Sequence, residues 1–205
     1  MPKPAQFWND RFATEEFVYG EAPNQFVASA AGAWLPDAAT VLTLGAGEGR
    51  NAVYLARQGH SVTALYYSTE GLAKTRRLAD AAGVTVDPLH ADVRSWTPDR
   101  TWDAVVTTFL HLPPDERPAF YRLIQQCLRP GGLLVAEWFR PEQRTDGYTS
   151  GGPPEVDMMV TADELRQHFA ADGIERLAVE TPVLDEGPHH SGPAATVRVV
   201  WRKTG

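Results

Sequence analysis

The chain has 205 residues, of which 43% are apolar, and it carries a formal net charge of −7. This is enough apolar material for one core, so we predict a single domain over 1–205, with a helical cap over 1–36 and an α/β core over 37–205. The sequence has no run of Lys and Arg, which argues against a nucleic-acid partner and favours a small-molecule substrate. It also lacks a signal-peptide pattern and a long apolar run, so we expect a cytoplasmic protein with no membrane partner.

Hydrophobic patterning predicts helices that alternate with short apolar strands. Residues 5–34 read as helical in two pieces, broken near Gly20-Glu21-Ala22-Pro23. Strands are expected at 40–45, 61–66, 84–89, 102–109, 132–139, 174–183 and 195–202. Helices are expected at 49–58, 69–82, 115–129 and 161–171, the last two capped by Asp115 and Thr161, with Glu164 completing a capping box.

This alternation is typical of a parallel sheet that helices cover on both faces. The last two strand candidates are joined by LDEGPHHSGP (184–193), which contains no helix, so they are expected to pair antiparallel. We therefore predict a doubly wound, mostly parallel seven-stranded sheet with an antiparallel C-terminal hairpin. The polar segment PEQRTDGYTSGGPPE (141–155) is longer than a minimal connection and is typical of a functional lid or a disordered loop.

The stretch VLTLGAGEGR (41–50) is a buried strand that runs into a glycine-rich turn. Gly45, Gly47 and Gly49 let a ligand approach the backbone at the carboxyl end of the strand. The dinucleotide fingerprint is broken, because Arg50 stands where it needs a third glycine or alanine, and Tyr66 stands where it needs the ribose-binding acid. No P-loop and no nucleophile elbow is present.

The stretch VLTLGAGEGRNAVYLARQGHSVTAL resembles the first motif of class I S-adenosylmethionine-dependent methyltransferases. It is most similar to their small tellurite-resistance and thiopurine-methyltransferase-like branch. The likeness extends to WNDRFATEEFVYGEAPNQFV (8–27), HADVRSW (90–96), WDAVVTTFLHLPP (102–114) and LRPGGLLVAEWF (128–139), and to GGPPEVDMMVTADELRQHF and EGPHHSGPAATVRVV. This resemblance implies a Rossmann-like methyltransferase fold over nearly the whole chain.

The resemblance also implies a role for each matching position. Gly45, Ala46, Gly47 and Gly49 would line the methionine and ribose parts of S-adenosylmethionine. Asp92 would hold the adenine amino group, with Val93 at the backbone edge of the base. Arg11, Tyr19, Gly20 and Arg50 would close the cap over the cofactor, and Phe109, Leu110 and His111 would lie where cofactor and substrate meet.

Two positions depart from the pattern of the family. Thr43 replaces an acid inside the first strand, and Tyr66 replaces the acid that accepts hydrogen bonds from the ribose hydroxyls. Losing those charge-assisted bonds would weaken cofactor binding by about 2–5 kcal/mol. Two compensations are open: a hydrogen bond from the phenol of Tyr66 or Tyr67, or contact of an aromatic face with the sulfonium or adenine.

Aromatic side chains predict a pocket for a planar or hydrophobic organic substrate. Its expected residues are Trp8, Leu110, Trp138, Phe139, Tyr148 and His190, beside Tyr66, Tyr67 and Phe109. His111 is the candidate general base, and the alternative is a histidine that orders its own loop. Glu137 is the second catalytic candidate, either orienting the substrate or supporting another residue. No Cys and His spacing matches a metal site, so we predict none.

Three functions remain open at this stage. The intact glycine turn and Asp92 favour a methyltransferase that acts on O, N or S of a small organic molecule. Thr43, Tyr66 and Trp138 favour a cyclase or isomerase of the same fold that no longer transfers methyl groups and works without the cofactor. A non-catalytic binding protein is the third, with no specific feature in its favour.

Overall fold

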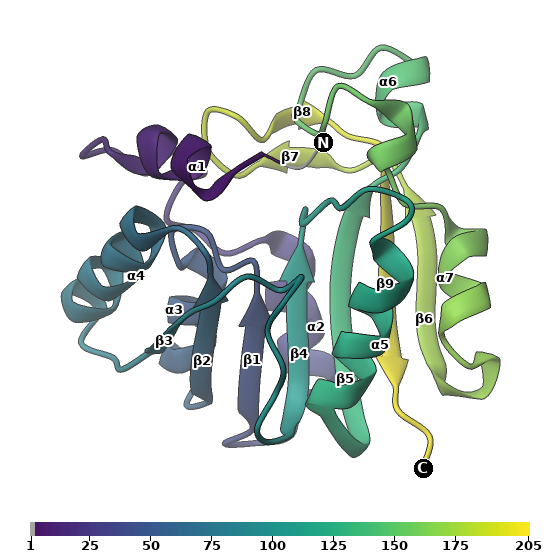
Figure 1. The fold of residues 1–205 in the computed structure, drawn as a ribbon, viewed down its shortest axis with the longest axis horizontal. Helices are drawn as coiled ribbons and strands as arrows, with labels where there is room; N and C mark the ends of the chain where they lie inside the picture. The colour runs from purple at the N-terminus through teal and green to yellow at the C-terminus, as the bar shows by residue number, and fades with distance from the viewer. Residues whose placement is uncertain (1–2) are drawn as a thin grey trace.

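A computed structural model describes residues 3–205 as a layered α/β structure (Figure 1). Seven strands form one sheet in the order β3-β2-β1-β4-β5-β9-β6. Their bounds are β1 Thr40–Leu44, β2 Ser61–Tyr66, β3 Asp87–His90, β4 Trp102–Thr108, β5 Leu128–Phe139, β6 Ile174–Glu180 and β9 Thr196–Arg202. The strands β1 to β5 pair in parallel, and β9 pairs antiparallel with both β5 and β6. The predicted sheet and its antiparallel C-terminal hairpin are confirmed.

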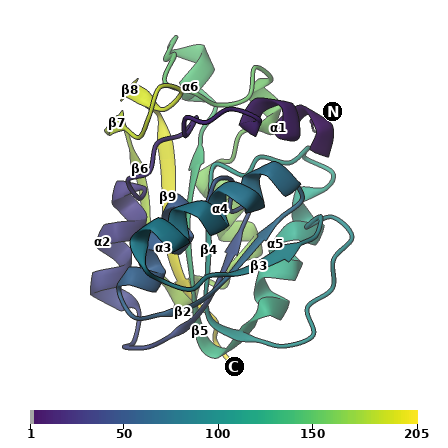
Figure 2. The same ribbon diagram turned by 90° about the vertical axis from the view of Figure 1, so that its left-hand side faces the viewer.

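Five of the helices form two layers, one on each face of the sheet (Figures 1 and 2). The helices are α1 Ala5–Phe12, α2 Gln25–Trp34, α3 Arg50–Arg57, α4 Thr69–Ala82, α5 Arg117–Cys127, α6 Glu142–Thr145 and α7 Ala162–His168. Alternate residues of β1 explain the two layers: Val41 packs with α2, α3 and α4, whereas Leu42 packs with α5 and α7. A strand points successive side chains to opposite faces, so each buried strand serves two cores.

Two segments lie beyond the carboxyl ends of the parallel strands (Figure 1). One is α1, and the other is a small hairpin of β7 Val183–Asp185 and β8 Ser191–Pro193. The expected strand over 174–183 is therefore two strands, because β6 ends at Glu180 before the Thr181-Pro182 step. Proline cannot donate a ladder hydrogen bond, which suits a break at this point.

The cap over 1–36 and the helix caps differ in part from the prediction. The break between α1 and α2 runs from Ala13 to Asn24, which is longer than the expected break near Gly20. Thr161 caps α7, since its side chain accepts a hydrogen bond from the Glu164 amide, but Asp115 does not cap α5, which begins after Glu116. None of the helices in residues 3–205 is long and apolar enough to cross a membrane.

Candidate active site

A cavity of about 410 Å³ opens beyond the carboxyl ends of β1, β2 and β4, beneath α1 and the β7–β8 hairpin. Every residue expected to line or hold the cofactor lines this cavity except Gly49, and so do five of the expected substrate or catalytic residues. The lining residues predicted from sequence are Arg11, Tyr19, Gly20, Gly45, Ala46, Gly47, Arg50, Tyr66, Tyr67, Asp92, Val93 and Phe109, with Trp8, Leu110, His111, Phe139 and His190. Glu137, Trp138 and Tyr148 do not line it.

The glycine turn after β1 forms the floor of the cavity. Gly45 and Gly47 both have a positive φ, of 70° and 60°, a backbone conformation that residues other than glycine rarely adopt. A Cβ on Gly47 would meet no atom within 4 Å and would project into open space. Gly49 differs, because a Cβ there would lie 2.6 Å from the Thr75 side chain of α4. Gly47 is thus an open cradle, whereas Gly49 lets α3 pack closely on α4.

Tyr66 lies at the end of β2 with its ring against Gly71 at the start of α4 and its centroid 6.1 Å from that of Phe12 in α1. The side chain is buried, and burial raises the pKa of its phenol well above the usual value. No residue of 3–205 accepts or donates a hydrogen bond at this hydroxyl, which therefore remains available to a ligand in the cavity. The neighbouring Tyr67 donates its hydroxyl to the backbone oxygen of Lys3 instead.

Asp92 stands at the cavity wall after β3, where the resemblance places the adenine contact. Its carboxylate accepts hydrogen bonds from the Arg94 guanidinium and from the Arg94 amide. These bonds hold the pKa of the Asp92 carboxyl below its usual value. Asp92 is thus an ionised acceptor at neutral pH, and the lone pairs that Arg94 leaves unused can receive a donor from a base.

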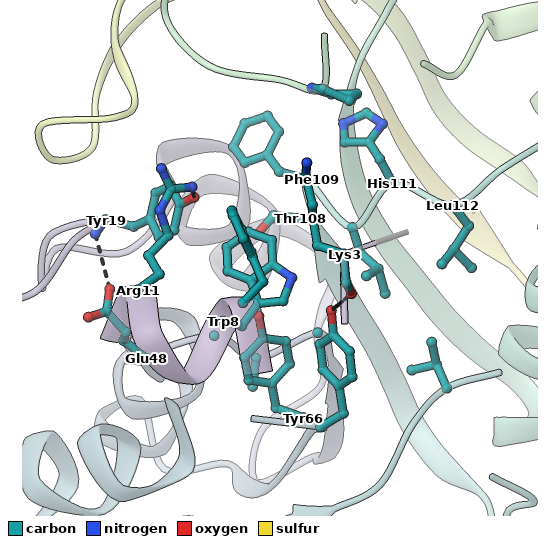
Figure 3. Close-up of a pocket in the computed structure, with 18 of the residues that line it drawn as sticks. Lys3, Trp8, Arg11, Tyr19, Glu48, Tyr66, Thr108, Phe109, His111 and Leu112 are labelled. Atoms are coloured by element: carbon teal, nitrogen blue, oxygen red, sulfur yellow. Dashed lines mark hydrogen bonds between the residues drawn. The ribbon is translucent and has the colours of Figure 1, made fainter. Parts of the chain in front are cut away.

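The helix α1 closes the cavity with one cationic side chain, Arg11, and with three aromatic side chains. Arg11 donates to the Tyr19 hydroxyl and lies over the ring of Trp8, 5.7 Å from its centroid (Figure 3). Arg11 has no carboxylate partner among residues 3–205, so its charge is available to an anionic group of a ligand. Glu48 fixes the cap to the glycine turn, because its carboxylate accepts from the amides of Val18 and Tyr19.

Arg50 links the N-terminal cap to the β7–β8 hairpin. Its guanidinium donates to the Tyr19 carbonyl and to the Glu186 carboxylate, with an N–O distance of 2.6 Å in the ion pair. Gly187 meets Gly20 so closely that a Cβ on Gly187 would lie 2.5 Å from the Gly20 nitrogen. The hairpin and the cap therefore close the cavity together.

His111 contacts the cavity, but both of its ring nitrogens are engaged by backbone. Nδ1 lies 3.0 Å from the Met158 carbonyl, and Nε2 lies 3.3 Å from the Phe139 amide that donates to it. These partners fix a neutral ring with its proton on Nδ1, and burial lowers the pKa of His111 to about 4. A general base needs a free lone pair, so the geometry favours the alternative in which His111 orders its own loop.

Glu137 belongs to a buried polar network on the α2 side of β5. Its carboxylate accepts from Arg198 and from the side-chain amide of Asn24, both at 2.6 Å. The same Asn24 amide donates to Glu186 of the hairpin. Burial raises the pKa of Glu137, although the Arg198 charge opposes this shift. Glu137 thus holds β5, β9 and α2 together behind the cavity and reaches no ligand space.

Trp138 and Tyr148 also lie away from the cavity. Trp138 is only 1% exposed and packs in the core on the α5 side of the sheet, where its indole N–H donates to the Leu110 carbonyl. Tyr148 lies in the segment 141–155, which folds on itself through Arg144. That segment still contributes Gly152, Pro153, Pro154 and Glu155 to the cavity wall.

Several lining residues were not singled out from the sequence. Lys3, Phe7, Glu48, Asn51, Arg94 and Met158 all line the cavity. Met158 lies in VDMMV, a stretch noted only for its resemblance to the family. Arg94 had a local signal, because it follows Asp92 by two residues in a turn and can pair with it.

Comparisons with known proteins agree with this geometry. Residues 41–132 match the model of the methyltransferase domain family. The chain is 29% identical over 158 residues to a dTDP-3-amino-3,6-dideoxy-alpha-D-glucopyranose N,N-dimethyltransferase of Streptomyces fradiae, covering 75% of this chain and 59% of that relative. It is 27% identical over 100 residues to the probable S-adenosyl-L-methionine-dependent methyltransferase TehB of Haemophilus influenzae, covering 47% and 35%. The chain thus spans about three fifths and about a third of these relatives.

Two solved structures share the fold over almost the whole chain. One, reported with the conversion of a disulfide bond into a thioacetal group during echinomycin biosynthesis, has a TM-score of 0.73 at 20% identity and covers 98% of this chain and 89% of its own. TehB from Haemophilus influenzae has a TM-score of 0.71 at 17% identity and covers 98% and 67%. Residues 41–132 therefore match the methyltransferase domain family, and the chain resembles the tellurite-resistance-like branch of class I S-adenosylmethionine-dependent methyltransferases.

Proposed function

We propose that the protein is an S-adenosylmethionine-dependent methyltransferase that acts on a small organic molecule with a planar, apolar body. The observation that carries the proposal is one cavity with two chemically distinct ends. One end holds the Gly47 cradle, Asp92 and Arg11, which match the needs of the cofactor. The other end holds Phe109 and Phe139, which match an apolar acceptor.

The residues at the first end fit the cofactor part by part. Gly47 offers open space beside its backbone, Asp92 offers an ionised acceptor for the adenine amino group, and Arg11 offers a cation without a carboxylate partner. The free Tyr66 hydroxyl stands in for the missing ribose acid with a neutral hydrogen bond. When bound, the cofactor supplies an electrophilic methyl group on a sulfonium that leaves as a neutral thioether.

The second end supplies shape, orientation and exclusion of water. Phe109 and Phe139 stack with their ring centroids 4.4 Å apart, and Met158, Pro153 and Pro154 extend this apolar wall. Phe109 has a φ of 55°, a strained backbone conformation that aims its ring at Phe139. Methyl transfer needs mainly an aligned acceptor in a dry site, which such a wall provides.

The test places a side chain in the open space beside Gly47 and leaves every side chain that could take part in methyl transfer unchanged. In Gly47→Leu the new side chain enters the open space over Gly47, so binding of S-adenosylmethionine should weaken at least about 100-fold, or about 2.7 kcal/mol, in calorimetric titration. Gly59→Leu is the matched control, because Gly59 has a φ of 90° and equally open surroundings but lies outside the cavity. Equal affinity of both variants would refute this placement of the cofactor.

A further inference from the structure

His190 differs from His111 in the hydrogen bonding of its ring nitrogens. Its Nδ1 is buried without a hydrogen-bond partner, and no residue of 3–205 hydrogen-bonds its Nε2 either. The residue is only 7% exposed, yet its ring lines the cavity. Backbone fixes the proton of His111 on Nδ1, whereas the tautomer of His190 is left to whatever ligand meets it.

Aromatic packing holds the His190 ring in place. Its centroid lies 4.8 Å from that of Tyr19 in the cap and 4.6 Å from that of Phe109, to which the ring stands edge-on. Gly151 also packs closely against the ring, since a Cβ there would lie 2.7 Å from His190 Cδ2. These contacts pack the ring on several sides, and because Nδ1 is buried, Nε2 is the nitrogen that remains for a ligand.

The apolar end of the cavity offers the acceptor almost no other side chain with an unused lone pair. His111 is engaged by backbone at both nitrogens, and the Thr108 hydroxyl already accepts one hydrogen bond from Asn51, which leaves it a single lone pair. Glu155 lies at the exposed rim. The Nε2 lone pair of His190 is engaged by no residue of 3–205, so a ligand in the cavity can use it as a hydrogen-bond acceptor.

We propose that His190 accepts a hydrogen bond from the methyl acceptor and takes the acceptor's proton during transfer. The acceptor is then a planar apolar molecule that carries an O–H or S–H group. This proposal rests on the proposed methyltransferase function and names the substrate class of the same cavity.

The step conserves charge and electrons. The acceptor's lone pair forms the bond to the methyl carbon, and the carbon–sulfur bond breaks toward sulfur. The acceptor–hydrogen bond then breaks toward the acceptor atom, and the lone pair of Nε2 forms the new N–H bond. One positive charge, on sulfonium before transfer, is on the His190 imidazolium afterwards.

The surroundings keep His190 neutral before transfer. It is faced by Arg50 from α3, Arg11 and Tyr19 from the cap, His111 from the loop after β4 and His189 from its own hairpin. Burial, followed by the Arg50 charge, lowers its pKa to about 3. The ring is thus an available acceptor at neutral pH, and an oxygen or sulfur atom that has just been methylated is acidic enough to protonate even a weak base.

The experiment compares phenol with anisole, its methyl ether, which has the same ring but no O–H to donate. Calorimetric titration of the full chain at pH 7 should show phenol binding about three- to tenfold more tightly than anisole. His190→Phe should abolish this preference, and His190→Gln, whose amide oxygen accepts near the position of Nε2, should restore most of it. His189→Gln on the same hairpin is the control and should keep it, since His189 is exposed.

Equal affinity for phenol and anisole in the unmodified protein would overturn the proposal, and so would a preference that survives in His190→Phe. A separate titration of His190→Phe with S-adenosylmethionine should match the unmodified protein. Failure of both proteins to bind the cofactor would count against the methyltransferase function, whereas the phenol comparison tests His190 independently of it.

Discussion

At the scale of single residues, the structure shows what Tyr66 does in place of the acid. Its ring fills the space between Phe12 and Gly71, and its free hydroxyl meets the cavity. A neutral phenol gives a hydrogen bond of about 1 kcal/mol, compared with about 1.5–3 kcal/mol for a bond to a charged group. We therefore expect the natural protein to bind its cofactor more weakly than a relative that keeps the acid.

Restoring the acid tests this reading of Tyr66. Tyr66→Asp should bind S-adenosylmethionine about tenfold more tightly than Tyr66→Asn in calorimetric titration, because only the carboxylate gives charge-assisted bonds to the ribose. The two variants leave the same cavity where the tyrosine ring was, so the loss of packing cancels in the comparison. Equal affinities would mean that position 66 does not meet the ribose.

His111 predicts a pH dependence of stability. Its folded pKa, about 4, lies below its unfolded value, so the unfolded chain binds the proton more readily. The neutral buried ring is therefore favoured above pH ~6.5, and stability falls as pH drops toward 4 by at most about 1.4 kcal/mol per pH unit.

The check is the urea unfolding midpoint at pH 7.5 and 5. His111→Asn cannot titrate, and its amide can still donate to the Met158 carbonyl, so the variant should lose less stability between these pH values than the unmodified protein. An identical loss in both proteins would show that His111 does not titrate in this range on unfolding.

At the scale of elements, the β7–β8 hairpin closes the site by contact with the cap. Gly187 and Gly192 of this segment both have a positive φ, of 91° and 101°, so replacing either glycine by a residue with a side chain would strain the backbone. They differ in surroundings, because a Cβ on Gly187 meets the Gly20 backbone, whereas one on Gly192 meets nothing within 4 Å. Comparing a substitution at Gly187 with one at Gly192 therefore separates the effect of backbone strain, which both share, from the effect of contact with the cap, which only Gly187 makes.

We expect Gly187→Ala to lower the free energy of unfolding by about 1–3 kcal/mol more than Gly192→Ala, because overpacking adds to the strain. It should also weaken cofactor binding, since the cap has to move. Urea unfolding and calorimetric titration measure the two effects. If the two variants behave alike, the hairpin does not press on the cap in solution.

The local sequence pattern predicts most of the helices and strands, whereas the others depend on contacts between residues that are distant in the chain. Apolar runs and the GAGEGR turn mark β1, β2 and α3, because strand and turn propensities are local. The apolar pattern predicts one strand over 174–183, whereas the structure breaks it at Thr181-Pro182 and forms the β7–β8 hairpin, whose pairing depends on residues that follow it in the chain.

The site residues divide in the same way. Gly47 could be placed because the glycine-rich turn follows the first strand, and Asp92 because HADVRSW resembles the adenine-binding loop of the family. Alternation along β5 says that Glu137 and Trp138 point to opposite faces, but not that both faces are filled there, by Asn24 on one side and by the α5 core on the other. The roles of His111 and His190 depend on partners distant in sequence, which no local pattern records.

At the scale of the whole molecule, the carboxyl ends of parallel strands, the cap and the hairpin enclose one cavity. The doubly wound sheet brings the glycine turn, Asp92 and Phe109 to one edge, although they are far apart in sequence. Fold alone does not fix activity, so the central claim is that this cavity binds the cofactor despite Tyr66.

Calorimetric titration of the unmodified protein with S-adenosylmethionine tests this claim most directly, after mass spectrometry has excluded ligand carried through purification. We predict binding with a Kd on the order of 10–100 μM, because Tyr66 replaces charged by neutral hydrogen bonds while Gly47, Asp92 and Arg11 remain. No heat of binding and no displacement at millimolar cofactor would contradict the account and would favour a cofactor-independent reaction in the aromatic end of the cavity.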